Sequence, residues 1–186
     1  HDFGTHGERI YLAMELIEGE DLESLIQDSG PISESMGWAL ARQVAAGLAH
    51  AQELGIVHRD IKPANLLLTK PPAGFAMAEN VPLVKITDFG LAKLAVEQGG
   101  KTRLTVVGTA MGTPFYMAPE QVSDSDVDHR ADIYALGVSM FHMLTGMPPY
   151  QGMTIGQIVV AKVTGDSSWL DDLTTHCSVE SMRLLK

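Results

Sequence analysis

Two short polar segments place acidic, basic and amide side chains close together in the sequence. The first, HRDIKPAN at 58–65, places a carboxylate (Asp60), an ammonium (Lys62) and an amide (Asn65) in one tight loop. The second, DFG, begins with Asp88 at the end of an expected strand. A carboxylate can accept the proton of an attacking hydroxyl, and a lysine can neutralise charge on a phosphate. Amide and carboxylate oxygens are ligands that Mg²⁺ prefers. These residue types therefore predict metal-assisted phosphoryl transfer.

A third segment, APE at 118–120, follows in the order and spacing of a larger motif set. Each segment alone is weak evidence, because DFG also occurs at 2–4, where we expect a chance match in a turn. Together, the three resemble the catalytic-loop, metal-binding and activation-segment motifs of eukaryotic-type protein kinases. The local sequences HRDIKPANLLL and VDHRADIYALG are most similar to those of bacterial Ser/Thr kinases.

The resemblance assigns roles around the reacting phosphate. It implies that Asp60, Lys62, Asn65 and Thr113 are catalytic, that Asn65 and Asp88 bind Mg²⁺, and that Asp88 also contacts bound ATP. A lysine two residues after the catalytic aspartate is similar to the Ser/Thr-specific branch, so a protein Ser or Thr hydroxyl is the implied acceptor. The segment GTPFYMAPE, which contains Thr113, resembles the platform for a protein substrate. That segment speaks against a small-molecule kinase.

Arg59, directly before Asp60, resembles the arginine of kinases that are switched on by phosphorylation of the activation loop. Thr102, Thr105 and Thr109 are the candidate acceptors, and the sequence leaves the choice among them open. Dimerisation for autophosphorylation of this loop is a route that we keep open.

The stretch YLAMELIEG at 11–19 resembles the strand and hinge that pack on adenine. Alignment with the family makes Met14 the gatekeeper, and the backbone C=O of Glu15 and N–H of Ile17 the readers of the purine edge. Asp21 is implied near the ribose, and Leu67 beneath the adenine.

Four further positions follow from the resemblance. Asp132 corresponds to a buried helix aspartate that holds the backbone of the catalytic loop, and His58 to a core histidine without a catalytic role. Ala64 and His142 occupy positions that are acidic in kinases preferring basic substrates, so a basic peptide preference is not supported.

The elements that position these residues can be predicted from local patterns. Residues 9–16 are β-rich, 91–115 sustain no period, and 70–82 contain three prolines and a glycine, which indicates a loop. Apolar spacing and capping residues predict helices, and short apolar runs predict strands. The helices are expected at 21–27, from Ser33 to Gly55, and at 127–145, 154–163 and 178–186, and the strands at 65–69 and 83–87.

Composition excludes several classes of protein. The 186 residues include 13 Lys+Arg against 23 Asp+Glu, and a net charge of -10 argues against nucleic-acid binding. The single cysteine, Cys177, excludes an internal disulfide framework. The longest apolar stretch, 131–147, is interrupted by His142, Thr145 and two glycines, so we expect a buried core helix and no membrane segment.

The resemblance to protein kinases implies an α+β fold with a mainly helical C-lobe, short β-hairpins, and the last N-lobe strands and hinge. Residues 1–17 are expected to be a remnant of the N-lobe, and 18–186 a C-lobe that is incomplete at its C-terminus. No Gly-x-Gly-x-x-Gly or Val-Ala-x-Lys segment is present. We therefore expect a fragment of a kinase domain, weakly active or inactive in isolation. It would be cytoplasmic, with any membrane anchor of the full-length protein outside this segment. The alternative is a kinase-like scaffold that does not transfer phosphate.

Overall fold

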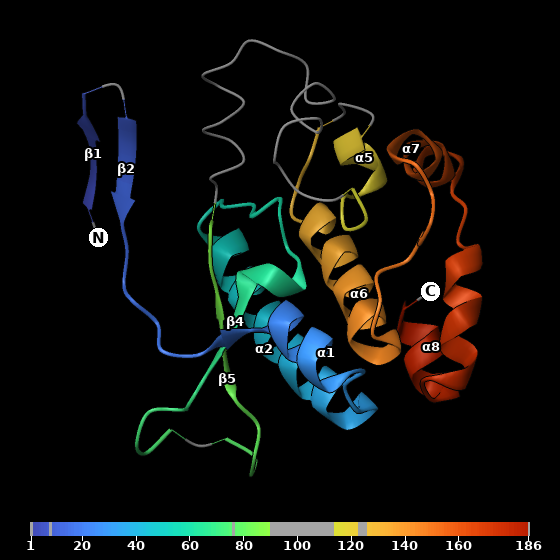
Figure 1. Ribbon diagram of the computed structural model, residues 1–186, viewed down its shortest axis with the longest axis horizontal. Coiled ribbons are helices and arrows are strands. Elements are labelled where there is room, and N and C mark those ends of the chain that lie inside the picture. Colours follow the sequence, from blue (N-terminus) through green and yellow to red (C-terminus); the bar gives the residue numbers. More distant parts are fainter. Residues whose placement is uncertain (1, 8, 76, 90–113, 123–125, 186) are drawn as a thin grey trace.

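The computed structural model describes residues 2–7, 9–75, 77–89, 114–122 and 126–185 (Figure 1). Strands β1 (Asp2–His6) and β2 (Arg9–Ala13) form an antiparallel hairpin. The expected turn at 2–4 is therefore wrong. Gly4 pairs with Tyr11 across the hairpin, and a Cβ at Gly4 would lie 2.6 Å from the Tyr11 hydroxyl oxygen. The glycine thus leaves room for a ring that covers the neighbouring strand. The strand expected at 9–16 ends at Ala13.

A second sheet has the order β3-β4-β5, with both pairings antiparallel. It contains β3 (Glu20–Asp21), β4 (Leu66–Thr69) and β5 (Leu83–Ile86). Leu66 and Leu68 of β4 are buried, whereas Leu67 lies on the opposite face and pairs with Lys85. This alternation follows from the two-residue period of a strand. The two strands predicted from short apolar runs are confirmed.

The first two helices begin at the residues that the sequence indicates. Helix α1 (Leu22–Ser29) is capped by Asp21, whose carboxylate accepts a hydrogen bond from Ser24 N at 2.8 Å. Helix α2 (Glu34–Glu53) is capped by Ser33, and Gly55 follows its end with a φ of 71°. A glycine adopts this left-handed conformation without the strain of a Cβ.

The C-terminal half is helical. It contains α5 (Pro119–Val122), α6 (Arg130–Thr145), α7 (Ile155–Thr164), α8 (Val179–Leu185) and a 3₁₀ helix at Ser168–Thr175. Helix α6 starts three residues later than the predicted 127–145. Thr154 and Gln157 form a capping box at the start of α7, which satisfies backbone N–H groups that would otherwise lack partners.

The core lies where α2 packs on α6. A Cβ at Gly37 of α2 would lie 3.1 Å from the Met140 methyl carbon of α6, so the glycine permits a close crossing. Leu40, Val44 and Met143 are almost completely buried at this contact. Figure 1 shows α1, α2 and α6 grouped together, with the β1–β2 hairpin on one side of them and α8 on the other. The α+β class is confirmed.

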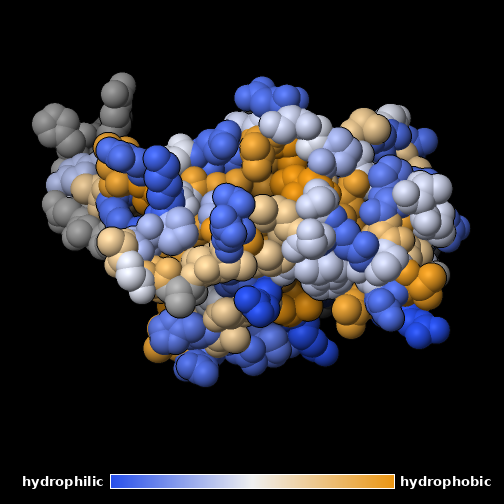
Figure 2. Space-filling view, turned by 90° about the horizontal axis from the view of Figure 1, so that it is seen from below, coloured by the Kyte–Doolittle hydropathy of each residue, from blue (hydrophilic) through white to orange (hydrophobic). Residues whose placement is uncertain are grey.

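The surface seen in Figure 2 mixes hydrophilic residues with separate hydrophobic patches. Among the described residues, no helix has both the length and the apolar character needed to cross a membrane. The apolar stretch 131–147 is instead α6, whose residues are mostly buried against α2 and neighbouring elements.

Candidate active site

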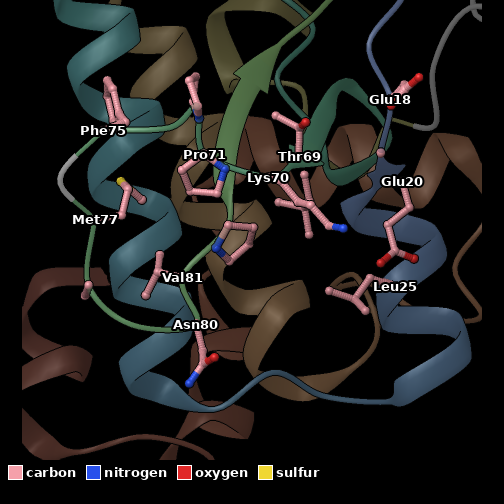
Figure 3. A pocket seen from close by; sticks show the side chains of 15 residues that line it. Glu18, Glu20, Leu25, Thr69, Lys70, Pro71, Phe75, Met77, Asn80 and Val81 are labelled. Atoms are coloured by element: carbon pink, nitrogen blue, oxygen red, sulfur yellow. The ribbon is translucent and has the colours of Figure 1, made fainter.

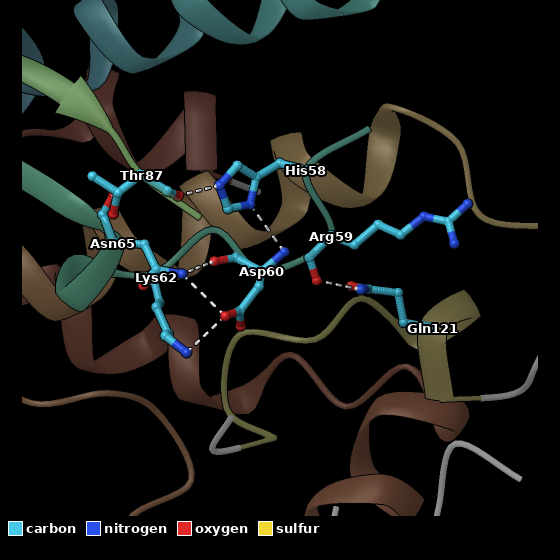
Figure 4. A network of polar contacts seen from close by, with 7 residues as sticks. All are labelled: His58, Arg59, Asp60, Lys62, Asn65, Thr87 and Gln121. Carbon is cyan, nitrogen blue, oxygen red and sulfur yellow. Dashed lines mark hydrogen bonds and ion pairs between the residues drawn. The ribbon is translucent and has the colours of Figure 1, made fainter. Parts of the chain in front are cut away.

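The loop between α2 and β4 brings three predicted catalytic side chains together (Figure 4). One carboxylate oxygen of Asp60 accepts hydrogen bonds from Lys62 Nζ at 2.8 Å and from Asn65 Nδ2 at 3.0 Å. The same Asn65 nitrogen donates to the backbone oxygen of Asp60 at 2.7 Å. A 3₁₀ turn at Pro63–Asn65 folds the chain back so that these contacts form. A carboxylate, an ammonium and an amide therefore share one small volume.

The ring of His58 supports this loop from within the core, where the residue is completely buried. Its Nδ1 accepts a hydrogen bond from Asp60 N at 3.2 Å, so its Nε2 carries the proton and donates to Thr87 O at 2.7 Å. Both ring nitrogens are used by the backbone, which matches the core role expected for this histidine.

Asp132, buried at the start of α6, holds the two residues before Asp60. Its carboxylate oxygens accept hydrogen bonds from His58 N at 2.8 Å and from Arg59 N at 2.7 Å. Arg59 has a φ of 70°, an unfavourable conformation for a residue with a Cβ. Two charge-assisted hydrogen bonds therefore fix a strained backbone immediately before the candidate base.

The end of β5 brings Asp88 next to this loop. Thr87 N donates to Asn65 O at 3.0 Å, so the residue before Asp88 is tied to the residue that closes the loop. The following Phe89 ring contacts His58 edge-on, with a centroid distance of 4.6 Å. Among the described residues, no three His, Cys, Asp or Glu side chains group as a metal cluster. Asn65 and Asp88, the residues predicted to bind a metal, would offer one amide oxygen and one carboxylate.

The segment leading into α5 is bonded to both the loop and α6. Gln121 Nε2 donates to Arg59 O at 2.8 Å, and Gln121 Oε1 accepts from Ala118 N at 2.8 Å. The Tyr116 hydroxyl lies 2.7 Å from His142 Nδ1, and burial lowers the pKa of His142. The neutral imidazole is therefore the form that suits this contact. His142 corresponds by resemblance to a position that is acidic in kinases preferring basic substrates. Its ring contacts Tyr116 within the protein.

Four predicted residues of this region lie outside the described residues. They are Thr113, for which we expect a catalytic role, and the candidate phosphorylation sites Thr102, Thr105 and Thr109.

Some of the residues predicted to contact adenine and ribose are linked to one another through β4. The Glu15 carboxylate accepts a hydrogen bond from Lys85 Nζ at 2.7 Å, and Lys85 pairs across the sheet with Leu67. Asp21 pairs with Leu67 on the other side of β4. The structure therefore gathers these residues around β4. Of the two remaining residues, Met14 is 55% exposed and Ile17 is half-buried.

A large open hollow of about 1080 Å³ lies beside the predicted loop 70–82 (Figure 3). Glu18 and Glu20 line one side, and Pro71, Phe75 and Val81 line the loop side. None of the four predicted catalytic or metal-binding residues that the structure describes, Asp60, Lys62, Asn65 and Asp88, lines it. The residues predicted for catalysis and metal binding are thus not part of the lining of this hollow.

One buried charged residue near the site was missed by the sequence analysis. Lys162 on α7 is 2% exposed, and its Nζ donates to Phe115 O at 2.8 Å. The signal was available, because this lysine interrupts the apolar run IVVAKV within a predicted helix.

Comparison with known proteins agrees with the geometry. The model of the protein kinase domain matches residues 1–182. The serine/threonine-protein kinase PknH of Mycobacterium bovis is 37% identical over 165 residues, which cover 89% of this chain and 25% of the relative. PknD and PknE of Mycobacterium tuberculosis are 37% and 38% identical, covering 87% and 82% of this chain and 22% and 24% of the relatives. This chain spans about a quarter of the length of these curated relatives. The relatives named above are bacterial Ser/Thr kinases. The kinase-domain match covers nearly the whole sequence, and the loop holds Asp60, Lys62 and Asn65 together, so this chain belongs to the protein kinase domain family.

Proposed function

We propose that this chain is part of the catalytic domain of a protein-serine/threonine kinase that transfers the γ-phosphoryl group of ATP to a protein hydroxyl. The observation that carries the proposal is the Asp60 carboxylate, held by Lys62 at 2.8 Å and Asn65 at 3.0 Å on a loop anchored to Asp132. Among the described residues, Asp60 is the carboxylate around which Lys62 and Asn65 converge.

Each residue has a role that its contacts allow. The Asp60 carboxylate orients the acceptor hydroxyl and takes its proton, while Lys62 places a positive charge beside the oxygens of the transferring group. Asn65 uses its amide nitrogen in both bonds to Asp60, so its amide oxygen is the atom available to a metal ion. Asp88 supplies a carboxylate from the end of β5. Such hard oxygen donors fit Mg²⁺, which would neutralise negative charge on the phosphates of bound ATP.

The nucleotide side of the proposal involves β4 and the segment before β3. Leu67 lies on the less buried face of β4, and Glu15 and Ile17 would bind the purine through their backbone, next to Met14. Asp21 has a competing use, because its carboxylate accepts hydrogen bonds from Ser24 N and Ser24 Oγ at 2.8 Å each. A ribose contact by Asp21 would therefore share a side chain that already caps α1.

We propose that residues 1–17 come from the N-lobe of such a kinase and that 18–186 come from its C-lobe. Thr113 as a catalytic residue, phosphorylation of the preceding loop and a cytoplasmic location remain predictions of the same proposal.

The proposal is tested by phosphoryl transfer in the complete protein. Radiolabel from ATP should reach dephosphorylated casein, and Asp60→Asn should lower kcat by roughly 10²- to 10⁴-fold, because an amide cannot take the proton. Asp28→Asn, the same chemical change at an exposed position of α1, is the matched control and should keep normal transfer. Equal transfer by the Asp60 and Asp28 variants would remove Asp60 from the mechanism. Absence of transfer by the unmodified protein with Mg²⁺ would favour the scaffold alternative.

A further inference from the structure

Lys162 is a buried lysine in the apolar contact between α7 and the segment before α5. Its side chain is 2% exposed, and Nζ donates hydrogen bonds to Phe115 O at 2.8 Å and to the Tyr134 hydroxyl at 3.1 Å. A lysine is seldom buried so completely, because removal of the ammonium from water is costly unless other groups compensate. The contacts around Nζ therefore identify what this residue holds.

Two aromatic rings complete the surroundings of the ammonium. Nζ lies 4.8 Å from the centre of the Tyr134 ring and 5.2 Å from that of Tyr150. Tyr134 comes from α6, and Tyr150 from the turn that connects α6 to α7. Ring faces attract a cation and partly replace the lost hydration. Nζ of Lys162 thus lies between a ring from α6 and a ring from the α6–α7 turn, and it donates to the backbone carbonyl of Phe115.

The carbonyl that Lys162 holds belongs to a segment with other fixed points. One residue later, Tyr116 contacts His142 of α6, and Gln121 of α5 bonds to the carbonyl of Arg59. The hydrogen bond to Phe115 O fixes the peptide plane between Phe115 and Tyr116. This segment is therefore attached to α7, to α6 and to the loop that carries Asp60, and Lys162 supplies the attachment to α7.

We propose that Lys162 is a positioning residue for the protein substrate. It acts through Phe115 and holds the segment 114–118 in the geometry in which a protein hydroxyl is presented to Asp60. The inference rests on the proposed kinase function, because it concerns the affinity for the substrate of that same reaction. It assigns no contact between Lys162 and the nucleotide.

The test compares three variants in the complete protein. Lys162→Met has a similar length and removes the donor, whereas Lys162→Arg keeps charge and donors. Val163→Met introduces the same residue at the next, exposed position of α7 and serves as the control. We measure kcat, KM for dephosphorylated casein and KM for ATP. Independently of activity, amide hydrogen exchange of the peptide 114–118 is measured and compared with that of a peptide from α2.

Loss of a buried hydrogen bond leads us to expect KM for casein to rise on the order of ten-fold in Lys162→Met. KM for ATP should stay within about two-fold of the unmodified value, since the hydrogen bond is remote from the nucleotide residues. Exchange of 114–118 should accelerate while that of α2 stays unchanged. Lys162→Arg should lie closer to the unmodified protein, and Val163→Met should match it.

Equal changes in both KM values, or unchanged exchange of 114–118, would overturn the inference and leave Lys162 as a packing residue. Failure of both Lys162 variants to fold would overturn it too, because the role would then be in folding. If the unmodified protein transfers no phosphate, the proposed function fails, and the exchange measurement still decides whether Lys162 positions the segment.

Discussion

The catalytic loop and the segment that precedes β3 are held in very different ways. In the loop 58–65, His58 and Asn65 are buried, and each of their polar side-chain nitrogens is bonded to the backbone or to another side chain. In 14–19, Met14 and Leu16 are 55% and 90% exposed. The side-chain hydrogen bond described for this segment joins Glu15 to Lys85.

The difference in burial between the two segments shows which of them is ordered by the helical core. Buried polar groups must find partners, so the loop has a single arrangement in which its hydrogen bonds are complete. The exposed segment has no such requirement, because water can satisfy its polar groups. The α2–α6 core therefore orders the groups proposed for phosphoryl transfer without help from the residues proposed for adenine.

The largest effect should come from breaking the support of the loop. Asp132→Ala removes both acceptors of the His58 and Arg59 amides and leaves two backbone N–H groups without partners. Hydrogen bonds to a charged group contribute about 1.5–3 kcal/mol each, so we expect a loss of roughly 3–5 kcal/mol in the free energy of unfolding. Urea denaturation followed by circular dichroism measures it. Asp132→Asn keeps one acceptor oxygen and should lose less, and equal losses would argue that the carboxylate acts by its charge alone.

An intermediate effect should appear in the pH dependence of stability. Burial lowers the pKa of Lys162 from 10.5 in the unfolded chain to about 7. Between these values the unfolded chain binds the proton and the folded chain does not, so this group makes stability rise with pH. Below pH 7 both states are protonated, and the cost of the buried charge is fully present.

The measurement is the difference in unfolding free energy between the unmodified protein and Lys162→Met. From pH 7.5 to 9 this difference should shift in favour of lysine by up to about 1.4 kcal/mol per pH unit. Tyr134 and Tyr150 face the ammonium, and burial raises the pKa of both hydroxyls, so neither titrates in this window. A difference that stays flat with pH would show that the lysine keeps its proton in the fold.

The smallest effect should come from the exposed segment. Glu15→Gln removes the ion pair with Lys85, in which the glutamate side chain is 61% exposed. Exposed pairs contribute little, so the free energy of unfolding should change by about 0.5 kcal/mol or less. Thermal unfolding at low and high salt measures this. A loss as large as that of Asp132→Ala would end the contrast between the two regions.

Much of this structure could be predicted from local sequence. Asp21, Ser33 and Thr154 cap the helices that their positions indicate, and the strands around Leu67 and Val84 follow from short apolar runs. The convergence of Asp60, Lys62 and Asn65 also follows, because the six residues of a tight loop leave little freedom. Their catalytic and metal-binding roles remain predictions.

Features that depend on distant contacts could not be predicted in this way. The strand at 2–4 depends on pairing with 11–13, so the local DFG sequence was misleading. The apolar run around Lys162 hints at burial, but its partner Phe115 O is set only by the packing of α7, and the 3₁₀ helix at Ser168–Thr175 has no distinctive period. Each of these features is set by packing between elements that lie far apart in the sequence.

Gln121 has a consequence for how the two halves of the site can move. The side-chain amide of Gln121 forms two hydrogen bonds with the backbone: its oxygen accepts from the N–H of Ala118, and its nitrogen donates to the carbonyl of Arg59. The bond to Arg59 O joins α5 to the loop that carries Asp60, whereas the bond to Ala118 N lies within the segment that leads into α5. The segment proposed to receive a protein substrate and the loop that carries the proposed base are therefore joined by a hydrogen bond, so a displacement of α5 would act on the backbone next to Asp60.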